Sequence, residues 1–236
     1  MNTYTVDNYH NGLPALFEVF ENCEISNEIR NNRIWEPHLH KIFEKYINNE
    51  SIVLEGGCHI GTHSIKLAKI CKRLYTFEPM PRSNDLLKKN IAQNNLLNVI
   101  TSSNGLSNLI SNTYFEWVPN GNIGGSGLAN NPMGKPNFIT AIEDKIVVDL
   151  ITIDSLKLDK IDFIKLDVEG YEELVIEGAM HTINKCRPII IMEVWKNHYG
   201  EFSLEYTKNK FIRLLELGYD VFHIDGPDFL FTPISI

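Results

Sequence analysis

The sequence predicts an α/β fold, a doubly wound and mostly parallel sheet that closes with a C-terminal β-hairpin. Segments of strand and helix character alternate along the 236 residues, and the connections between them are short. The run Ile189–Met192 is continuously apolar, as are parallel strands buried on both faces. With 43% hydrophobic residues and no internal repeat, the chain is long enough for one buried core. We therefore expect one domain at residues 51–236, preceded by an N-terminal helical cap at residues 1–50.

The order of the elements follows from apolar spacing and from turn residues. In the first fifty residues, helical patches are formed by Leu16, Phe17, Val19 and Phe20, and by Ile42, Phe43 and Tyr46. Strands are expected at residues 51–55, 75–78, 98–102, 146–153, 163–168 and 188–194, and helices at residues 62–71, 83–94, 172–184 and 205–217, with Ser83 as the cap of the second helix. The closing hairpin is expected at residues 219–224 and 229–233. The Gly-, Asn- and Pro-rich segment 119–137 predicts a long loop or lid.

Composition narrows the classes of partner. The formal net charge of −8 argues against nucleic acid, because phosphate binding needs a concentrated positive surface. No apolar run approaches the ~20 residues of a membrane span, and the N-terminus has no apolar signal core. The four cysteines lack C-x-x-C spacing, which disfavours zinc and fits free thiols in a reducing compartment. We expect a cytoplasmic protein, with homodimerisation as an open alternative.

The most informative stretch is residues 52–61. An apolar strand ends at the carboxylate of Glu55, and a turn containing Gly57 and Gly61 then leads into a helix. This is how an α/β sheet presents its carboxyl edge to a cofactor, but the spacing differs from the dinucleotide pattern G-x-G-x-x-G. A carboxylate just before the turn disfavours a pyrophosphate and suits a cation. S-adenosylmethionine carries a sulfonium, an ammonium and a ribose, and it has no phosphate.

Polar residues are expected at one edge of the sheet, because ligands of such sheets bind beyond the carboxyl ends of the strands. The strand ends carry Glu55, Glu78, Asn104–Gly105, Asp167–Gly170 and Glu193. Glu78 lies 23 residues after Glu55, close to the ~20-residue offset at which a carboxylate binds ribose hydroxyls. A single acid of this kind is often only a helix-start residue that complements the helix dipole. Five strand ends together predict a site.

Several motifs resemble one family. They are Glu-Gly-Gly-Cys-His-Ile-Gly (55–61), Phe-Glu-Pro (77–79), Asn-Gly-Leu-Ser (104–107), Ile-Asp-Phe-Ile-Lys-Leu-Asp-Val-Glu-Gly-Tyr-Glu (161–172) and Arg-Pro-Ile-Ile-Ile-Met-Glu-Val (187–194). The sequence from about residue 33 to 195 is similar to FkbM-type methyltransferases, which are S-adenosylmethionine-dependent O-methyltransferases of the Rossmann-like class I. Two departures are Glu55, where that pattern has Asp, and Cys58-His59, where it has a small residue and an amide.

The resemblance implies roles for individual residues. The methionine portion of the cofactor would be held by Glu55, Gly57 and the turn with Cys58, His59 and Gly61, the ribose by Glu78, and the adenine by the turn with Asn104 and Gly105. Trp35-Glu36-Pro37 also resembles a family element, so Glu36 would help to close the pocket. A solvated acid at a helix start is the alternative for Glu36.

Methyl transfer to a hydroxyl is an in-line displacement that needs alignment and removal of a proton. Asp167 is the expected base or orienting group beside the cofactor's methyl, Glu193 is the second choice, and His198 follows a strand at the same edge. A divalent metal at Asp167, Glu193 or a nearby histidine stays open, although no ligand motif supports one. His38, His40 and His63 are expected to be structural.

The expected acceptor is a hydroxyl of a sugar, a glycan or a small natural product, with Tyr114 and Trp117 as aromatic surfaces for a sugar ring. Two other classes stay open. A nicotinamide-dependent sugar dehydrogenase or epimerase is disfavoured, because G-x-G-x-x-G and a Tyr-x-x-x-Lys pair are absent. A non-catalytic module with the same fold is disfavoured by the acids at the strand ends.

Overall fold

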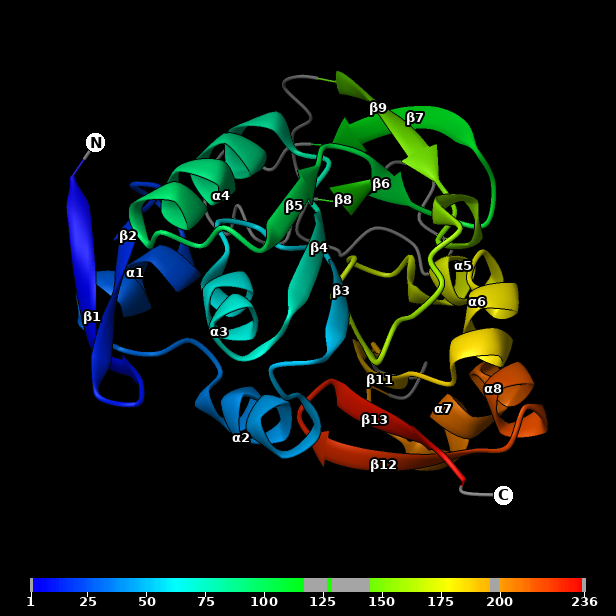
Figure 1. The fold of residues 1–236 in the computed structure, drawn as a ribbon. Coiled ribbons are helices and arrows are strands. Elements are labelled where there is room, and N and C mark those ends of the chain that lie inside the picture. The colour runs from blue at the N-terminus through cyan, green and yellow to red at the C-terminus, as the bar shows by residue number, and fades with distance from the viewer. Residues whose placement is uncertain (1, 117–126, 129–144, 196–199, 235–236) are drawn as a thin grey trace.

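A computed structural model describes residues 2–116, 127–128, 145–195 and 200–234. Its centre is a seven-stranded sheet in the order β12-β13-β11-β10-β3-β4-β5 (Figure 1). Five neighbouring strands are parallel: β11 (Ile189–Glu193), β10 (Phe163–Leu166), β3 (Ile52–Gly56), β4 (Arg73–Phe77) and β5 (Val99–Ser102). The antiparallel hairpin of β12 (Tyr219–Asp225) and β13 (Asp228–Pro233) closes the sheet beside β11. The predicted fold class and the C-terminal hairpin are confirmed.

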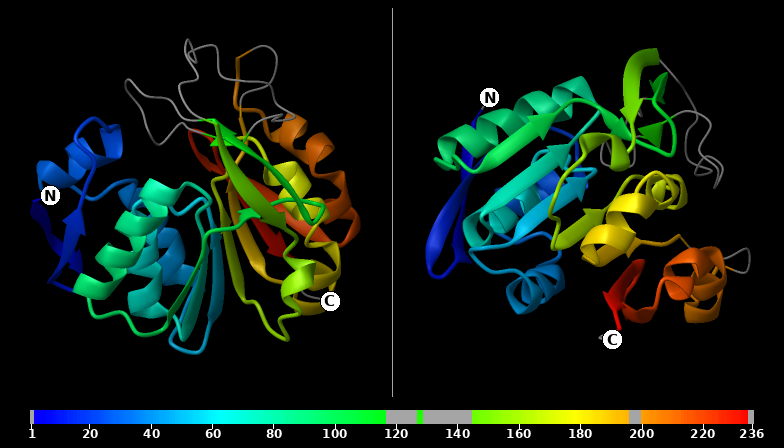
Figure 2. Two further views of the ribbon diagram at one scale, coloured as in Figure 1. Left: turned by 90° about the horizontal axis from the view of Figure 1, so that it is seen from above. Right: turned by 45° about the vertical axis from the view of Figure 1, so that its right-hand side comes forward.

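Helices cover both faces of this sheet (Figure 2). One side carries α2 (Pro37–Tyr46), α3 (Thr62–Ile70) and α4 (Pro81–Gln93), and the other carries α5 (Glu172–Glu177), α6 (Met180–Cys186), α7 (Leu204–Lys210) and α8 (Ile212–Glu216). Alternate strand residues supply the two cores: Val53 and Phe163 pack with α2 and α3, whereas Leu54 and Ile164 pack with α5 and α6. Burial on both faces explains why these strands are almost entirely apolar.

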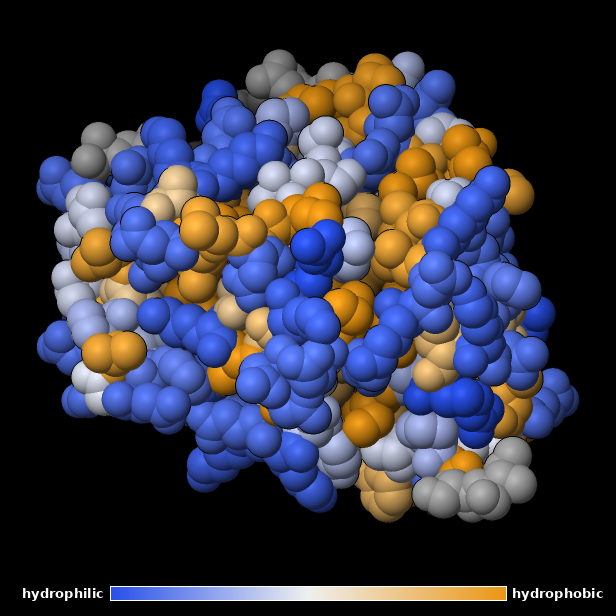
Figure 3. All heavy atoms as spheres, in the orientation of Figure 1, coloured by the Kyte–Doolittle hydropathy of each residue, from blue (hydrophilic) through white to orange (hydrophobic). Residues whose placement is uncertain are grey.

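A second sheet lies beside the carboxyl edge of the first. Its order is β6-β9-β7-β8, with β6 (Gly105–Leu106), β9 (Lys145–Ile151), β7 (Ser111–Glu116) and β8 (Gly127–Leu128), and a 3₁₀ helix, η2 (Asp154–Leu156), follows β9. Near it, Leu109, Ile110 and Val147 are 62–71% exposed. Figure 3 shows hydrophobic residues gathered in this region. A homodimer contact stays a prediction.

The helical cap expected at residues 1–50 is wrong for its first part. β1 (Thr3–His10) and β2 (Leu13–Glu18) form an antiparallel hairpin, and only then do α1 (Glu24–Arg30) and α2 follow. Burial alternates along β2: Ala15 and Phe17 are buried, whereas their neighbours in the strand are not. The hairpin packs on Ile65 and Leu86 of α3 and α4. The N-terminal segment is therefore a strand pair followed by helices, and it shares a core with the sheet.

Other boundaries also differ. The helix predicted at 83–94 begins at Pro81 with Met80 as its cap, so Ser83 is a buried residue of the first turn and does not cap the helix. The helix predicted at 172–184 is divided at Gly178, where a Cβ would lie 2.1 Å from the backbone oxygen of Ser107. The predicted loop 119–137 lies outside the described residues, except for 127–128. No helix in the described ranges is long and apolar enough to cross a membrane.

Candidate functional site

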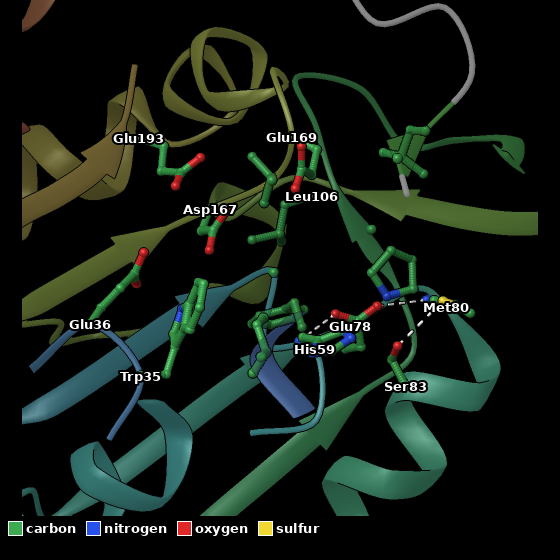
Figure 4. A pocket seen from close by; sticks show the side chains of 18 of the residues that line it. Trp35, Glu36, His59, Glu78, Met80, Ser83, Leu106, Asp167, Glu169 and Glu193 are labelled. Atoms are coloured by element: carbon green, nitrogen blue, oxygen red, sulfur yellow. Dashed lines mark hydrogen bonds between the residues drawn. The ribbon is translucent and has the colours of Figure 1, made fainter. Parts of the chain in front are cut away.

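A pocket lies at the carboxyl ends of β3, β4, β10 and β11 (Figure 4). Residues of β6, β8 and α1, and the residues just before α2, complete its lining. It contains about 1050 Å³ of empty space, part of it open to solvent. The lining residues are Glu24, Ile25, Trp35, Glu36, Gly57, His59, Phe77, Glu78, Pro79, Met80, Ser83, Gly105, Leu106, Gly127, Leu128, Asp167, Val168, Glu169 and Glu193. The carboxyl edge of the sheet, where a site was expected, is where the pocket lies.

Most of the predicted site residues meet here. Glu36, Gly57, His59, Glu78, Gly105, Asp167 and Glu193 all line the pocket, whereas Glu55, Cys58, Gly61 and Asn104 do not. The Glu55 carboxylate is buried under the turn and accepts a hydrogen bond of 2.5 Å from the Ser64 hydroxyl. The Cys58 thiol donates to the backbone oxygen of Glu55. Glu55, Cys58, Gly61 and Asn104 therefore belong to the strand end and the turns next to the pocket. His198, also predicted, lies outside the described residues.

Gly57 places two turns in contact. Its φ of +76° is a left-handed conformation that glycine adopts without cost, and a Cβ there would lie 1.6 Å from the backbone oxygen of Asp167. The Gly57 amide donates to the backbone oxygen of Phe77, and the Asp167 amide donates to that of Gly56. The turn after β3 is thus held between β4 and the end of β10, and Asp167 is brought beside it.

Glu78, which directly follows β4, is the most completely fixed polar group of the pocket. One carboxylate oxygen accepts from the His59 amide at 2.7 Å, and the other accepts from the Met80 amide at 2.9 Å (Figure 4). Burial raises the pKa of Glu78 to about 7, because desolvation outweighs these hydrogen bonds. A carboxylate has about four acceptor positions, so it can still accept hydrogen bonds from ligand hydroxyls.

His59 adds no cation to the pocket. Its backbone has a φ of +48°, and its half-buried ring lies beside Phe20, with Nε2 4.0 Å from the Cys23 sulfur. Burial lowers the pKa of His59 to about 4, so the imidazole is neutral near pH 7. The pocket therefore receives its charge from carboxylates.

Glu36, Asp167 and Glu193 lie across the pocket from Glu78 and Met80 (Figure 4). Burial and the negative charge of Asp167 raise the pKa of Glu169 to about 9, and the same charge, together with burial, raises that of Glu193 well above its usual range. No lysine or arginine is among the described lining residues. These raised pKa values mean that the carboxyls repel one another when charged, and a bound cation would relieve that repulsion. The site therefore suits a cationic ligand and opposes a pyrophosphate.

Glu36 is more than a solvated acid at a helix start. It precedes α2 in a left-handed conformation with a φ of 44°, and its carboxylate pairs with His63 at 2.8 Å. Burial opposes ionisation, but the hydrogen bond and the charge from His63 prevail and lower the pKa of Glu36. His63 thus contacts a pocket residue. Of the other two histidines in this segment, His38 pairs with Asp228 and His40 is buried.

Some lining residues were not predicted. Glu24, Ile25, Met80, Ser83 and Leu128 reach the pocket because α1, α4 and the second sheet pack around it. Their local sequence carries no cofactor motif. Tyr114 is half-exposed on β7 and does not line the pocket, and Trp117 lies outside the described residues. Within the described part of the chain, no group of three or more His, Cys, Asp or Glu residues could hold a metal ion.

A family model, the methyltransferase FkbM domain, matches residues 55–221. The chain belongs to the FkbM methyltransferase family. Members of this family depend on S-adenosylmethionine, and the resemblance seen in the sequence motifs is confirmed. No curated protein matches the sequence.

Solved structures show the same fold for this FkbM-family chain. An FkbM methyltransferase from Methylobacillus flagellatus KT superposes with a TM-score of 0.53 at 15% identity, covering 78% of this chain and 44% of that protein. This chain therefore spans less than half of that relative's length. An rRNA methylase from Streptococcus thermophilus has a TM-score of 0.50 at 11% identity (84% and 95% covered). A precorrin-6y C5,15-methyltransferase from Geobacter metallireducens has a TM-score of 0.50 at 10% identity (93% and 94% covered).

Proposed function

We propose that this FkbM-family protein is an S-adenosylmethionine-dependent O-methyltransferase that acts on a hydroxyl of a sugar, a glycan or a small natural product. The observation that carries the proposal is the Glu78 carboxylate, fixed by two backbone amides inside a pocket whose described lining includes five further acids and no lysine or arginine. A carboxylate held in this way matches a pair of ribose hydroxyls. The surrounding negative charge matches a sulfonium and opposes the pyrophosphate of a nicotinamide cofactor.

The order of the strands assigns parts of the pocket to parts of the ligand. Along the edge of the sheet, the strands run β11, β10, β3, β4 and β5. Glu78 after β4 would bind the ribose, Gly105 and Leu106 after β5 would adjoin the adenine, and Gly57 after β3 would allow close approach of the methionine portion. The bound cofactor supplies an electrophilic methyl group on its sulfonium. The edge at β10 and β11 is then left for the acceptor.

Asp167 and Glu193 lie at that edge. A hydroxyl becomes a better nucleophile as its proton is removed, and the carboxylate of Asp167 would orient the hydroxyl and accept its proton. Glu193 is the second candidate. The negative charge of Asp167 and burial raise the pKa of Glu193 well above its usual range, which makes it the weaker candidate for a charged base. Trp35, which lies beside this part of the pocket, replaces Tyr114 and Trp117 as the aromatic surface proposed for a sugar ring (Figure 4).

Cofactor choice is tested by calorimetric titration with S-adenosylmethionine and, separately, with NAD. We expect micromolar binding of the former, weakened roughly tenfold to a hundredfold by Glu78→Ala, because a hydrogen bond to a charged group contributes about 1.5–3 kcal/mol. Replacing exposed Glu205 with Ala is the matched control and leaves the affinity unchanged. Binding of NAD alone would instead support the dehydrogenase alternative.

The role of Asp167 is tested with Asp167→Asn, which keeps the shape and removes the charge. Loss of a general base lowers turnover by about 10²–10⁴-fold, while we expect the affinity for S-adenosylmethionine to change only a few-fold. Methyl transfer is measured over a panel of hydroxylated sugars, with a chelator and with added divalent metal, and exposed Asp149→Asn serves as the control. Turnover retained by Asp167→Asn removes this residue from the mechanism.

A further inference from the structure

Lys165 is a buried lysine in the middle of the central sheet. It lies on β10 between β3 and β11, in register with Glu55 and Ile191, and its side chain is only 4% exposed. The other residues of β10 are apolar, as expected for a strand at the centre of a parallel sheet. An ammonium group in this position pays a desolvation penalty of several kcal/mol unless nearby charges offset it.

Those charges come from the pocket. Lys165 Nζ lies 3.4 Å from Asp167 Oδ2. A narrow crevice is lined by Lys165 together with Glu36, Asp167 and Glu193, and these three carboxylates also line the main pocket. Lys165 itself does not line the main pocket. In the part of the chain that the structure describes, no other lysine or arginine lines the main pocket or the crevice.

The groups facing Lys165 come from every element around it. Glu55 faces it from β3, Glu36 from the start of α2, Glu193 from β11 and Asp228, paired with His38, from β13. Burial alone would lower the pKa of Lys165, but Asp167, Glu55, Glu36 and Glu193 together raise it above its usual range. The residue is therefore charged, and it acts in turn against protonation of Glu36 and Glu55.

The geometry points to Lys165 as a positioning residue of the proposed methyl-transfer site: from behind the pocket, its ammonium orients the Asp167 carboxylate and opposes protonation of the carboxylates that face it, in favour of a cationic cofactor. This inference rests on the proposed function. Lys165 does not line the main pocket, so its place is to act through Asp167 and the other carboxylates that face it. The charge state of the carboxylates facing Lys165 thus depends in part on one buried cation.

Three variants test this role. Lys165→Met removes the charge, Lys165→Arg keeps it, and Lys66→Met is the matched control. Lys66 is an equally buried lysine, but it pairs with Glu44 and His10 away from the pocket. Binding of S-adenosylmethionine is measured by calorimetry from pH 6 to pH 8, in two buffers with different ionisation enthalpies, so that the protons released per cofactor bound are obtained.

Without the ammonium, the pocket carboxyls hold protons at higher pH, and a cation must displace those protons when it binds. Between pH 8 and pH 6, we expect the affinity for S-adenosylmethionine to fall at least tenfold more in Lys165→Met than in the wild type. At pH 7, the variant should release more protons per cofactor bound. Lys165→Arg restores most of the wild-type behaviour, and Lys66→Met matches the wild type. A role in folding alone would change the melting temperature without changing proton release.

The outcomes separate the two proposals. If the wild type binds S-adenosylmethionine and Lys165→Met shows the same pH dependence and proton release, the role of Lys165 is refuted while the proposed function stands. If the wild type binds none, the proposed function fails and the role of Lys165 in it fails too. Should Lys165→Met not fold, the double variant Lys165→Met/Glu55→Gln, which also removes the opposing buried charge, gives the same comparison with the same expected steepening.

Discussion

Gly57 and Gly12 have the same backbone conformation in different surroundings. Both have a φ of +76°, but a Cβ on Gly57 would lie 1.6 Å from the Asp167 backbone oxygen, whereas one on Gly12 would meet nothing within 4 Å. Gly12→Ala should therefore cost about 1 kcal/mol from backbone strain alone. Gly57→Ala should cost more than about 4 kcal/mol, because two turns must separate. Urea unfolding of both variants measures the difference, and equal losses would show that the contact is unimportant.

Two other residues show what the sequence could and could not predict about the site. Glu55 and Glu78 both accompany the end of a parallel strand, and both were expected to contact a ligand. Glu55 lies inside β3, where its side chain points into the layer beneath and meets Ser64, whereas Glu78 comes one residue after β4 ends and turns into the pocket. Successive strand residues point to opposite faces, so a shift of one position decides whether a carboxylate lies under the helices or in the pocket. Sequence spacing cannot locate a strand end that precisely.

At the scale of elements, α4 holds the N-terminal hairpin through two asparagines one turn apart. Asn90 accepts from the Glu18 amide and donates to its carbonyl, and Asn94 does the same for Leu16. These side-chain amides thus make the hydrogen bonds to the β2 backbone that a neighbouring strand would otherwise make. Asn90→Ala leaves these backbone groups unpaired, and we expect a loss of roughly 2–3 kcal/mol in the free energy of unfolding.

Chemical denaturation measures this loss, and Lys88→Ala, on the exposed side of the same helix, is the control that should change stability by less than about 0.5 kcal/mol. Hydrogen exchange gives a second measurement, because the Glu18 amide should lose protection in Asn90→Ala. Unchanged protection would mean that the hairpin is held by its apolar face alone.

The same hairpin shows why one element was predicted wrongly. Asn11-Gly12 is a favourable pair for a tight hairpin turn, and the buried residues Ala15, Phe17 and Val19 alternate. Leu16 and Phe20, however, fill the intervening positions with apolar side chains, so the run also fits a helix. The core strands were predicted well because burial on both faces leaves long apolar runs. A half-buried strand in a polar segment gives a weaker hydrophobic pattern. The helix that holds β2 in place, α4, lies about 70 residues away in the sequence.

At the scale of the whole molecule, the acidic pocket sets how stability depends on pH. Burial raises the pKa of Glu78 and of Glu172 to about 7 and, with the charge of Asp167, that of Glu169 to about 9. In the unfolded chain, these carboxyls lose their protons near pH 4.5. Burial also lowers the pKa of His40 and of His59, which acts in the opposite direction, but only below about pH 6.5.

Above pH 6.5, therefore, the folded protein holds more protons than the unfolded chain, and its stability falls as the pH rises. We expect the melting temperature of the protein without ligand to drop by roughly 5 °C between pH 6.5 and pH 8. Glu169→Gln, which cannot ionise, should flatten this slope, whereas Glu205→Gln on the exposed surface should not. Differential scanning calorimetry at constant ionic strength measures the slope. A melting temperature that stays constant over this range would mean that the pocket carboxylates are already fully charged in the folded protein, and one that rises would contradict the expected sign.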